Sequence, residues 1–218
     1  MWIVVFSFDE INKIYDGKYK RKSIPYEKYF GEMDLSEEQK RERISFAKRF
    51  EELMMFLFFL LNAYEEYGDV EESIDFIIYT IKQRYKDIVI DYMALEEYIE
   101  ECIDEFVQDI VETTLKHKYE PYYTSEDRAV LTSENEANTI LNYKDFIDAI
   151  QQGFTKKIWN TERDGNVRAT HVPLEGKVLD ISIPYVVGDS LMLFPKDTSY
   201  GASQEEIANC RCTITYLK

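Results

Sequence analysis

The sequence has few of the residues from which disulfide frameworks, zinc clusters and phosphate-binding loops are built. It contains three cysteines, two histidines and eight glycines among 218 residues. An odd, small number of cysteines does not indicate a disulfide framework, so a reducing compartment is expected. The sequence also has no glycine-rich phosphate loop and no serine-centred nucleophile elbow. Neither nucleotide-binding nor serine-hydrolase chemistry is therefore predicted.

Long apolar runs are also scarce. The longest, Leu53–Leu61, has nine residues, about half of what a membrane-crossing helix needs. The apolar stretch Trp2–Phe8 is short, has no basic residues before it and is followed by Asp9 and Glu10, so it does not resemble a signal peptide. We therefore expect a protein that is made in the cytoplasm and has no membrane partner.

Basic residues are outnumbered by acidic ones. There are 26 basic and 42 acidic residues, which gives a formal net charge of −16. Between Phe50 and Leu115 the only bases are Lys82, Arg84 and Lys86, against 18 acids. Such a surface repels a phosphate backbone, so the charge disfavours direct binding of DNA. An acidic mimic of nucleic acid that occupies a basic partner remains an alternative.

The first half of the chain has the pattern of helices. Apolar residues make up 45% of the sequence, which is typical of a folded protein. Asp34 or Ser36 can cap a helix that continues to about Tyr67. Apolar residues at three-and-four spacing predict a second helix over Val70–Tyr92. It continues, unbroken or with a bend, into Leu95–Lys116. The preceding stretch, Lys13–Gly31, is predicted to be an irregular arm.

A domain boundary is predicted at Pro121–Tyr123. Residues 1–123 would form a helical, acidic region that docks to a partner, and residues 124–218 a small separate domain. Ser133 and Glu136 match a capping box that would open a short helix ending at Gly153. Strands are predicted over Phe154–Thr161, Asn166–Val172, Val178–Ile183, Leu191–Phe194 and Arg211–Leu217, with Asp164–Gly165 as a hairpin turn between the first two. The predicted fold class is α+β: a helical N-terminal region followed by one helix and a small antiparallel sheet.

The rarest residue types gather in the last third of the chain. His171, Cys210 and Cys212, with Asp164 or Asp180, could form a zinc site. On an extended strand, however, Cys-x-Cys directs its two side chains to opposite faces, so both could bind one ion only if the chain turns there. We expect instead that one cysteine faces the core and the other is partly exposed.

Catalysis is a further alternative at the same residues. Cys210 and His171, with an acid, could form a nucleophile–base pair, so the alternative to a binding protein is a metal- or cysteine-dependent enzyme that uses His171, Cys210 and Cys212. Nothing in the sequence requires it. Arg168 and Arg211 could contact a phosphate or carboxylate partner, or pair with internal acids.

An ordered series of residues in this part of the chain resembles a known family. The matching residues are Glu134, Ala137, Gly153, Lys156–Trp159, Asp164, Arg168–His171, Leu174–Gly176, Phe194–Pro195 and Asn209–Cys212. They resemble the phage head morphogenesis, or minor capsid, proteins of the Mu F-like type over roughly residues 130–218. The chain departs from the family pattern at Glu175, where an Asp is usual, and at Pro184–Tyr185, where a Phe is common.

The resemblance implies a virion component that is made in the bacterial cytoplasm and associates with the portal during head assembly. It implies no catalytic residues and no cofactor. The expectation is thus a non-enzymatic minor head protein in the phage head, with the portal and other head proteins as partners and a further role in DNA packaging or ejection. The family motif comprises Trp159, Asp164, Arg168, His171, Gly176, Pro195, Asn209, Cys210, Arg211 and Cys212.

Overall fold

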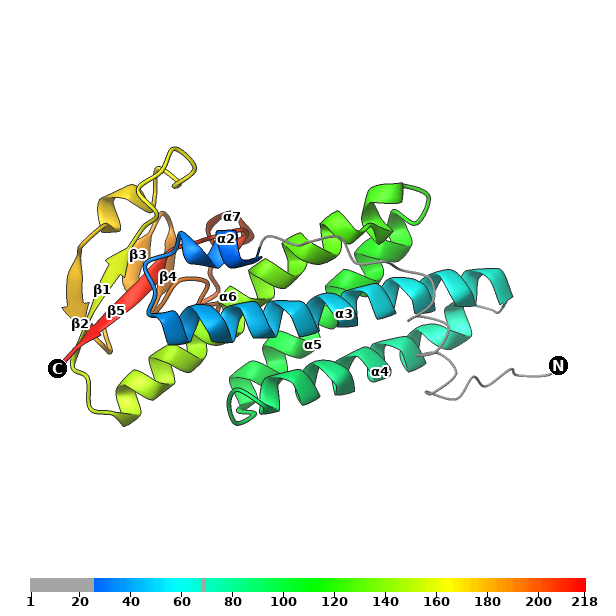
Figure 1. Ribbon diagram of the computed structural model, residues 1–218, viewed down its shortest axis with the longest axis horizontal. Coiled ribbons are helices and arrows are strands. Elements are labelled where there is room, and N and C mark those ends of the chain that lie inside the picture. The colour runs from blue at the N-terminus through cyan, green and yellow to red at the C-terminus, as the bar shows by residue number, and fades with distance from the viewer. Residues whose placement is uncertain (1–25, 68–69) are drawn as a thin grey trace.

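The computed structural model describes residues 26–67 and 70–218 (Figure 1). The predictions for Trp2–Phe8 and for residues 13–25 lie outside the described residues. The end of the predicted irregular arm is described, and it is the helix α2, Tyr26–Gly31. Tyr26 and Phe30 are fully buried, and the Tyr26 hydroxyl donates to Glu51 Oε2 at 3.1 Å. The arm is helical here because its aromatic residues pack against the next helix.

The predicted long helices are present. They are α3, Glu37–Tyr67, α4, Val70–Ile90, and α5, Glu97–Lys116. Ser36 is the cap of α3, since its Oγ accepts from Gln39 N at 3.2 Å while Gln39 Oε1 accepts from Ser36 N at 3.0 Å. A non-helical turn separates α4 from α5, so the two do not form one continuous helix.

The helix that follows begins earlier than its sequence signature predicts. The 3₁₀ turn η1, Pro121–Thr124, lies at the predicted chain break, and α6, Glu126–Gln151, starts directly after it. Ser125 is its cap and accepts from Arg128 N at 3.2 Å. The capping-box prediction was wrong because Ser133 lies inside the helix and donates to Ala129 O at 2.7 Å. The predicted end was right, since Gly153 has a φ of +75°.

The C-terminal region contains two small antiparallel sheets. In the first, β1, Lys156–Asn160, lies between β2, Val178–Asp180, and β5, Thr213–Leu217. The second pairs β3, Tyr185–Val187, with β4, Ser190–Met192. The short elements η2, Val172–Leu174, and α7, Gln204–Ile207, complete the region. The structure thus confirms the predicted α+β fold class.

The predicted hairpin at Asp164–Gly165 is absent, and residues 166–172 form no strand. Instead β1 pairs with β2 in the register Lys156↔Asp180 to Ile158↔Val178. The Asp164 carboxylate accepts from Asn166 N at 2.9 Å, which closes a local turn within a loop. The Asp164–Gly165 dipeptide therefore forms a turn here. The partner of β1 is β2, further along the chain, and not the residues directly after this turn.

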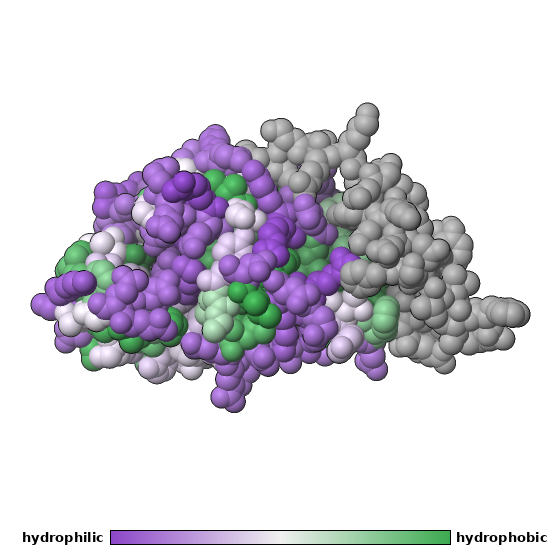
Figure 2. All heavy atoms as spheres, turned by 60° about the horizontal axis from the view of Figure 1, so that its bottom comes forward, coloured by the Kyte–Doolittle hydropathy of each residue, from purple (hydrophilic) through white to green (hydrophobic). Residues whose placement is uncertain are grey.

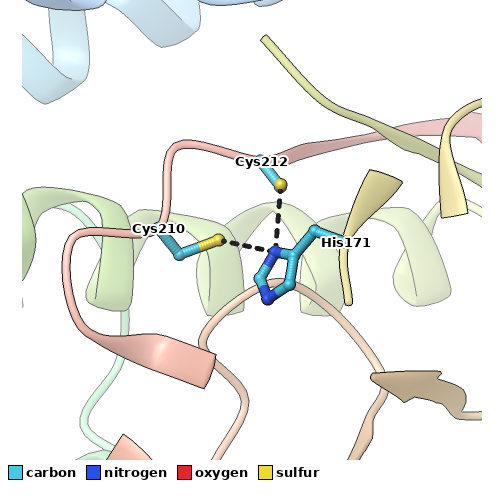
Figure 3. A group of neighbouring side chains, drawn as sticks. All are labelled: His171, Cys210 and Cys212. Atoms are coloured by element: carbon cyan, nitrogen blue, oxygen red, sulfur yellow. Dashed lines mark hydrogen bonds between the residues drawn. The ribbon is translucent and has the colours of Figure 1, made fainter. Parts of the chain in front are cut away.

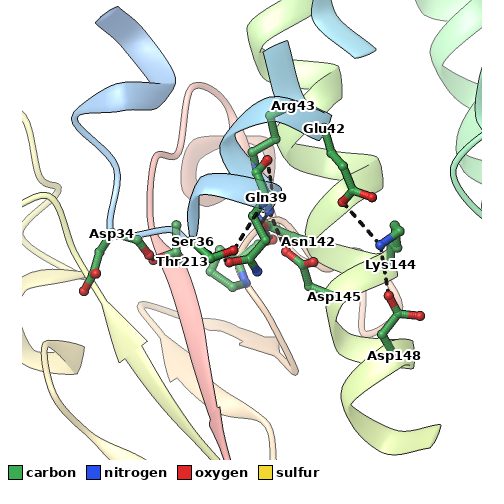
Figure 4. A network of polar contacts seen from close by, with 11 residues as sticks. Asp34, Ser36, Gln39, Glu42, Arg43, Asn142, Lys144, Asp145, Asp148 and Thr213 are labelled. Carbon is green, nitrogen blue, oxygen red and sulfur yellow. Dashed lines mark hydrogen bonds and ion pairs between the residues drawn. The ribbon is translucent and has the colours of Figure 1, made fainter. Parts of the chain in front are cut away.

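Two apolar clusters stabilise the fold. The larger joins α2 through α6 and includes Phe194, whereas the smaller surrounds Trp159 and includes Leu174, Tyr185, Val187, Met192, Ile207, Cys210 and Cys212. Helix α6 packs along α3, where the buried Arg43 donates to Asn142 Oδ1 at 2.9 Å and to Asp145 Oδ2 at 2.8 Å (Figure 4).

The predicted boundary near Tyr123 coincides with η1, but α6 on its C-terminal side belongs to the helical core. Among the described residues, no helix is long and apolar enough to cross a membrane.

Candidate functional site

The fold brings His171, Cys210 and Cys212 together. His171 lies directly before η2, and both cysteines lie between α7 and β5 (Figure 3). His171 Nδ1 is 3.4 Å from Cys212 Sγ and 3.6 Å from Cys210 Sγ. The three side chains are 1%, 3% and 4% exposed, and their ligand atoms lie within 4.8 Å of one another. We call these three residues the His–Cys₂ centre.

Both cysteines point to the same side because the chain is not extended between them. Strand β5 begins only at Thr213, so residues 210–212 lie outside it. Just before them Asn209 has a φ of +54°, and Cys210 N donates to Ile207 O at 3.2 Å. Asparagine tolerates this left-handed conformation better than most residues. The expectation of one buried and one partly exposed cysteine was therefore wrong, since it assumed a strand through Cys-Arg-Cys.

The acid at the centre is Glu206, which lies on α7. Its Oε2 is 3.0 Å from His171 Nε2 and accepts from Thr170 Oγ1 at 2.7 Å. Neither of the acids considered from the sequence takes this place, because Asp164 pairs with Arg211 and Asp180 lies exposed in β2. Glu206 was missed because no spacing rule links an acid on a short helix to a histidine 35 residues earlier.

The charges of the centre are coupled. Burial acts to lower the pKa of His171, but the hydrogen bond to Cys210, the charge of Cys210 and the hydrogen bond to Glu206 together outweigh it, and the pKa is raised. The pKa of Cys210 lies well below its usual range because Cys212 and His171 hydrogen-bond to its thiolate. The pKa of Cys212 is raised because Cys212 donates to that thiolate and is itself buried. The centre thus favours one thiolate next to one imidazolium.

Trp159 forms the apolar wall of the centre. It is fully buried in β1, and its ring meets that of His171 edge-on, with centroids 5.8 Å apart and an interplanar angle of 83°. The backbone of Trp159 is also fixed, since its carbonyl accepts from Gly176 N at 2.8 Å. Gly176 has a φ of +70°, a conformation that glycine adopts without strain. Two further motif residues therefore position the centre.

The two motif arginines are occupied by internal partners. Arg211 forms an ion pair with Asp164, which ties the loop after β1 to the Cys-Arg-Cys segment. Arg168 donates to the carbonyl of Ala208. Both contacts join the loop that carries His171 to the segment that carries the cysteines. The contacts of Arg168 and Arg211 therefore favour pairing with internal groups over binding of an external anion.

The remaining motif residues connect the sheets to α6. Asn142 Nδ2 donates to the carbonyl of Pro195 at 3.1 Å. Asn209 N donates to Asn135 Oδ1 at 3.0 Å. Lys196, which the sequence reading did not single out, lies beside them and donates to Ile207 O at 3.1 Å and to the same Asn135 side chain. The motif therefore spans the contact between α6 and the C-terminal region.

A second buried lysine was also given no role. Lys157 is fully buried in β1 and donates to Ile181 O at 2.8 Å and to Leu193 O at 2.7 Å. Burial lowers the pKa of Lys157 to about 8 and that of Lys196 to about 8. A lysine in a short strand, such as Lys157, or in a turn, such as Lys196, normally lies in solvent, so only the packing could reveal that these two are buried.

The departures from the family pattern have structural roles of their own. Glu175 Oε2 accepts from Thr161 N at 2.6 Å and from Thr161 Oγ1 at 2.8 Å. The Tyr185 hydroxyl donates to Lys157 O and to Lys177 O, at 3.0 Å each. Glu175 and Tyr185 therefore each form hydrogen bonds to neighbouring strands or loops.

No family model, curated protein or solved structure matches this chain. The resemblance to Mu F-like proteins accordingly rests on the motif residues alone and stays a prediction. Two thiols and an imidazole are soft donors suited to zinc, and a thiol–imidazole–carboxylate series is also the order of a cysteine nucleophile and its base.

Proposed function

We propose that this chain is a non-enzymatic minor head protein of a bacteriophage, located in the virion, that acts in head morphogenesis by docking to the portal. The proposal starts from the motif, and one observation supports it. Trp159, His171, Cys210 and Cys212 form one buried cluster. A motif whose residues are buried together determines the shape of a small fold. This role suits a docking protein better than an enzyme, whose catalytic residues line an open cleft.

A candidate docking surface is the outward face of α5. Exposed acids recur on it at intervals of four and seven residues: Glu97, Glu101, Glu105 and Glu112. We call these four residues the α5 acidic stripe. Neighbouring bases on α4 are already paired, Lys82 with Asp104 at 3.1 Å and Lys86 with Glu100 at 3.2 Å. Polar residues cover most of the face in Figure 2, and its apolar residues form separate patches. The matching partner surface would be basic.

Co-purification tests the docking role. The chain is co-expressed with the portal protein of the phage that encodes it, and both complexes and assembled heads are purified. We expect the chain in both. Replacement of Glu101, Glu105 and Glu112 by glutamine should weaken the complex, whereas neutralisation of Glu38, Asp180 and Glu205 changes the net charge equally and should not. Intact heads that contain no copies of the chain would refute the proposal.

An enzyme is the second candidate, favoured by the series Cys210–His171–Glu206. A catalytic thiolate has to meet a substrate, yet Cys210 is only 3% exposed. Alkylation of the folded protein with iodoacetamide distinguishes the two cases. The docking proposal expects Cys210 to react slowly, and no faster than in a variant lacking His171. Rapid, His171-dependent modification of Cys210 would favour the enzyme.

DNA contact is tested with the same complex. The charge of −16 leads us to expect no binding of double-stranded DNA by the isolated chain. If the acidic helices instead imitate nucleic acid, DNA should displace the chain from its basic partner. Competition at physiological salt between DNA and the chain would therefore support mimicry over docking.

A further inference from the structure

We propose that His171, Cys210 and Cys212 bind one zinc ion, through Nδ1 and the two Sγ atoms, and that Glu206 positions the imidazole for it. The ion would join the loop before η2 to the segment before β5. This inference does not depend on the proposed function, because it rests only on the geometry of the His–Cys₂ centre.

The two nitrogen–sulfur distances match edges of a zinc tetrahedron. With Zn–S bonds of about 2.3 Å and Zn–N bonds of about 2.0 Å, tetrahedral angles place nitrogen and sulfur about 3.5 Å apart. The two distances from His171 Nδ1 to sulfur are 3.4 and 3.6 Å. Figure 3 shows both sulfurs directed at this one nitrogen. The three donors therefore surround a point that one ion could occupy.

Nδ1 of His171 is the shared neighbour of both sulfurs, 3.6 Å from Cys210 Sγ and 3.4 Å from Cys212 Sγ. If Glu206 accepts the Nε2 proton of His171, Nδ1 presents a lone pair. A metal ion in this place uses the nitrogen lone pair and both sulfurs at once. The convergence of three buried donors on one point therefore fits a cation.

Glu206 provides the outer contact that metal-binding histidines usually have. A ligating imidazole commonly donates its other N–H to a carboxylate, which fixes its tautomer and orientation. Glu206 Oε2 lies 3.0 Å from Nε2 and is itself held by Thr170 Oγ1 at 2.7 Å. The acid, the ring and the two sulfurs therefore form a carboxylate–histidine–metal arrangement, built from α7 and two loops.

The surroundings suit bound thiolates. The buried indole N–H of Trp159, whose ring meets that of His171 edge-on, has no hydrogen-bond partner among the described residues and is an unused donor beside the centre. Two thiolates balance the charge of Zn²⁺, so the ion and its three ligands would have no net charge. Within the described part of the chain, three residues make up the group, which leaves the fourth position to a water molecule.

Zinc content provides the first test. The full chain, purified without a tag and without chelators, should contain about one zinc per molecule by elemental analysis. Cys210→Ser and Cys212→Ser should lose it. Cys102→Ser is the matched control, because Cys102 lies in α5 and contacts Thr198 at 3.9 Å instead of the centre, and it should retain the zinc. Folded wild-type protein without metal that does not bind added zinc would overturn the proposal.

A second measurement is independent of the folding of the variants. Zinc-stripped wild-type protein is titrated with Co²⁺, whose absorption reports tetrahedral geometry and thiolate ligands. We expect one equivalent to give an intense tetrahedral spectrum with a thiolate-to-metal band, and zinc to abolish it. A weak octahedral spectrum would overturn the assignment. A disulfide between Cys210 and Cys212 would also overturn it. Such a disulfide would leave one free thiol instead of three when the protein is purified under anaerobic conditions and then denatured.

The role of Glu206 is tested by affinity. Loss of an outer contact of this kind typically weakens metal binding about 10- to 100-fold. Glu206→Ala should show this loss in competition with a chelating dye, while Glu205→Ala, the exposed neighbour on the same helix, should bind like the wild type. Equal affinities for Glu206→Ala and Glu205→Ala would remove Glu206 from the site.

Discussion

The helical bundle and the C-terminal sheet region are stabilised by different kinds of contact. In the bundle, aliphatic and aromatic side chains from α2 to α6 share one large core. In the C-terminal region, a small cluster surrounds Trp159, and much of the packing is joined by directed contacts of His171, Lys157 and Lys196. The bundle therefore depends on many similar contacts, whereas the C-terminal region depends on a few specific ones.

The difference has a physical reason. Apolar burial is roughly proportional to area and has no preferred direction, so a large core tolerates exchange of one apolar side chain for another of similar volume. A small region buries little area and needs stronger local contacts to hold a single conformation. The short strands β2, β3 and β4 provide few backbone hydrogen bonds of their own. Side-chain contacts to carbonyls of neighbouring loops compensate for this.

The largest effect is expected from truncation in the bundle core. Phe50 is fully buried, and its ring packs against Tyr85 with centroids 4.6 Å apart. Phe50→Ala should lower the free energy of unfolding by about 3–5 kcal/mol, because it removes apolar area and leaves a cavity. Urea denaturation followed by circular dichroism measures it. Phe76→Ala, at a position that is 53% exposed on α4, should change the stability by less than about 0.5 kcal/mol.

The next largest effect concerns the polar contact between α3 and α6. Arg43→Ala should cost about 3 kcal/mol, because it leaves the carboxylate of Asp145 largely buried without its partner. Lys48→Ala is the control, since the Lys48–Glu27 pair is exposed and should contribute less than about 1 kcal/mol. Similar losses for the two variants would contradict the view that burial decides the strength of these pairs.

A pH-dependent effect separates the C-terminal region from the bundle. Burial lowers the pKa of Lys157 to about 8 in the folded protein, from its ordinary value of 10.5. Between these values the unfolded chain binds more protons, so the contribution of Lys157 to stability rises with pH. Relative to Lys157→Met, the wild type should gain up to about 1.4 kcal/mol per pH unit from pH 8 to 9.5. Urea denaturation at several pH values measures it, and a constant difference would contradict a lysine that titrates in this range.

The smallest effect is expected at Glu175 and its partner. Thr161→Val removes the hydroxyl that donates to Glu175 Oε2 at 2.8 Å but retains the backbone donor at 2.6 Å. The expected loss is about 1 kcal/mol, the usual contribution of one hydrogen bond. Thermal unfolding measures it, with Thr139→Val as the control for a helical threonine that bonds only to its own helix at 3.0 Å. A loss as large as that of Phe50→Ala would show that the loop after β1 controls the whole fold.

The prediction from sequence succeeded where a signal is local and repeated. The start of α3 follows from its cap at Ser36, α4 and α5 follow from apolar spacing, and the end of α6 follows from Gly153. The prediction failed where one local sequence pattern is compatible with more than one structure. The pattern of Ser133 and Glu136 occurs inside a helix whose cap is Ser125, because an earlier start buries more of α6 against α3. Likewise Asp164–Gly165 closes a turn without a hairpin.

By itself, the sequence determined the α+β class, the acidic helices and three residues of the candidate site, His171, Cys210 and Cys212. Periodicity and composition are properties of neighbouring residues, so they can be read along the chain. Only the tertiary structure decided that Cys210 and Cys212 face one nitrogen of His171, that Glu206 is the acid beside it, and that two lysines are buried. These relations join residues up to 61 positions apart, and their geometry depends on how the sheets pack on α6.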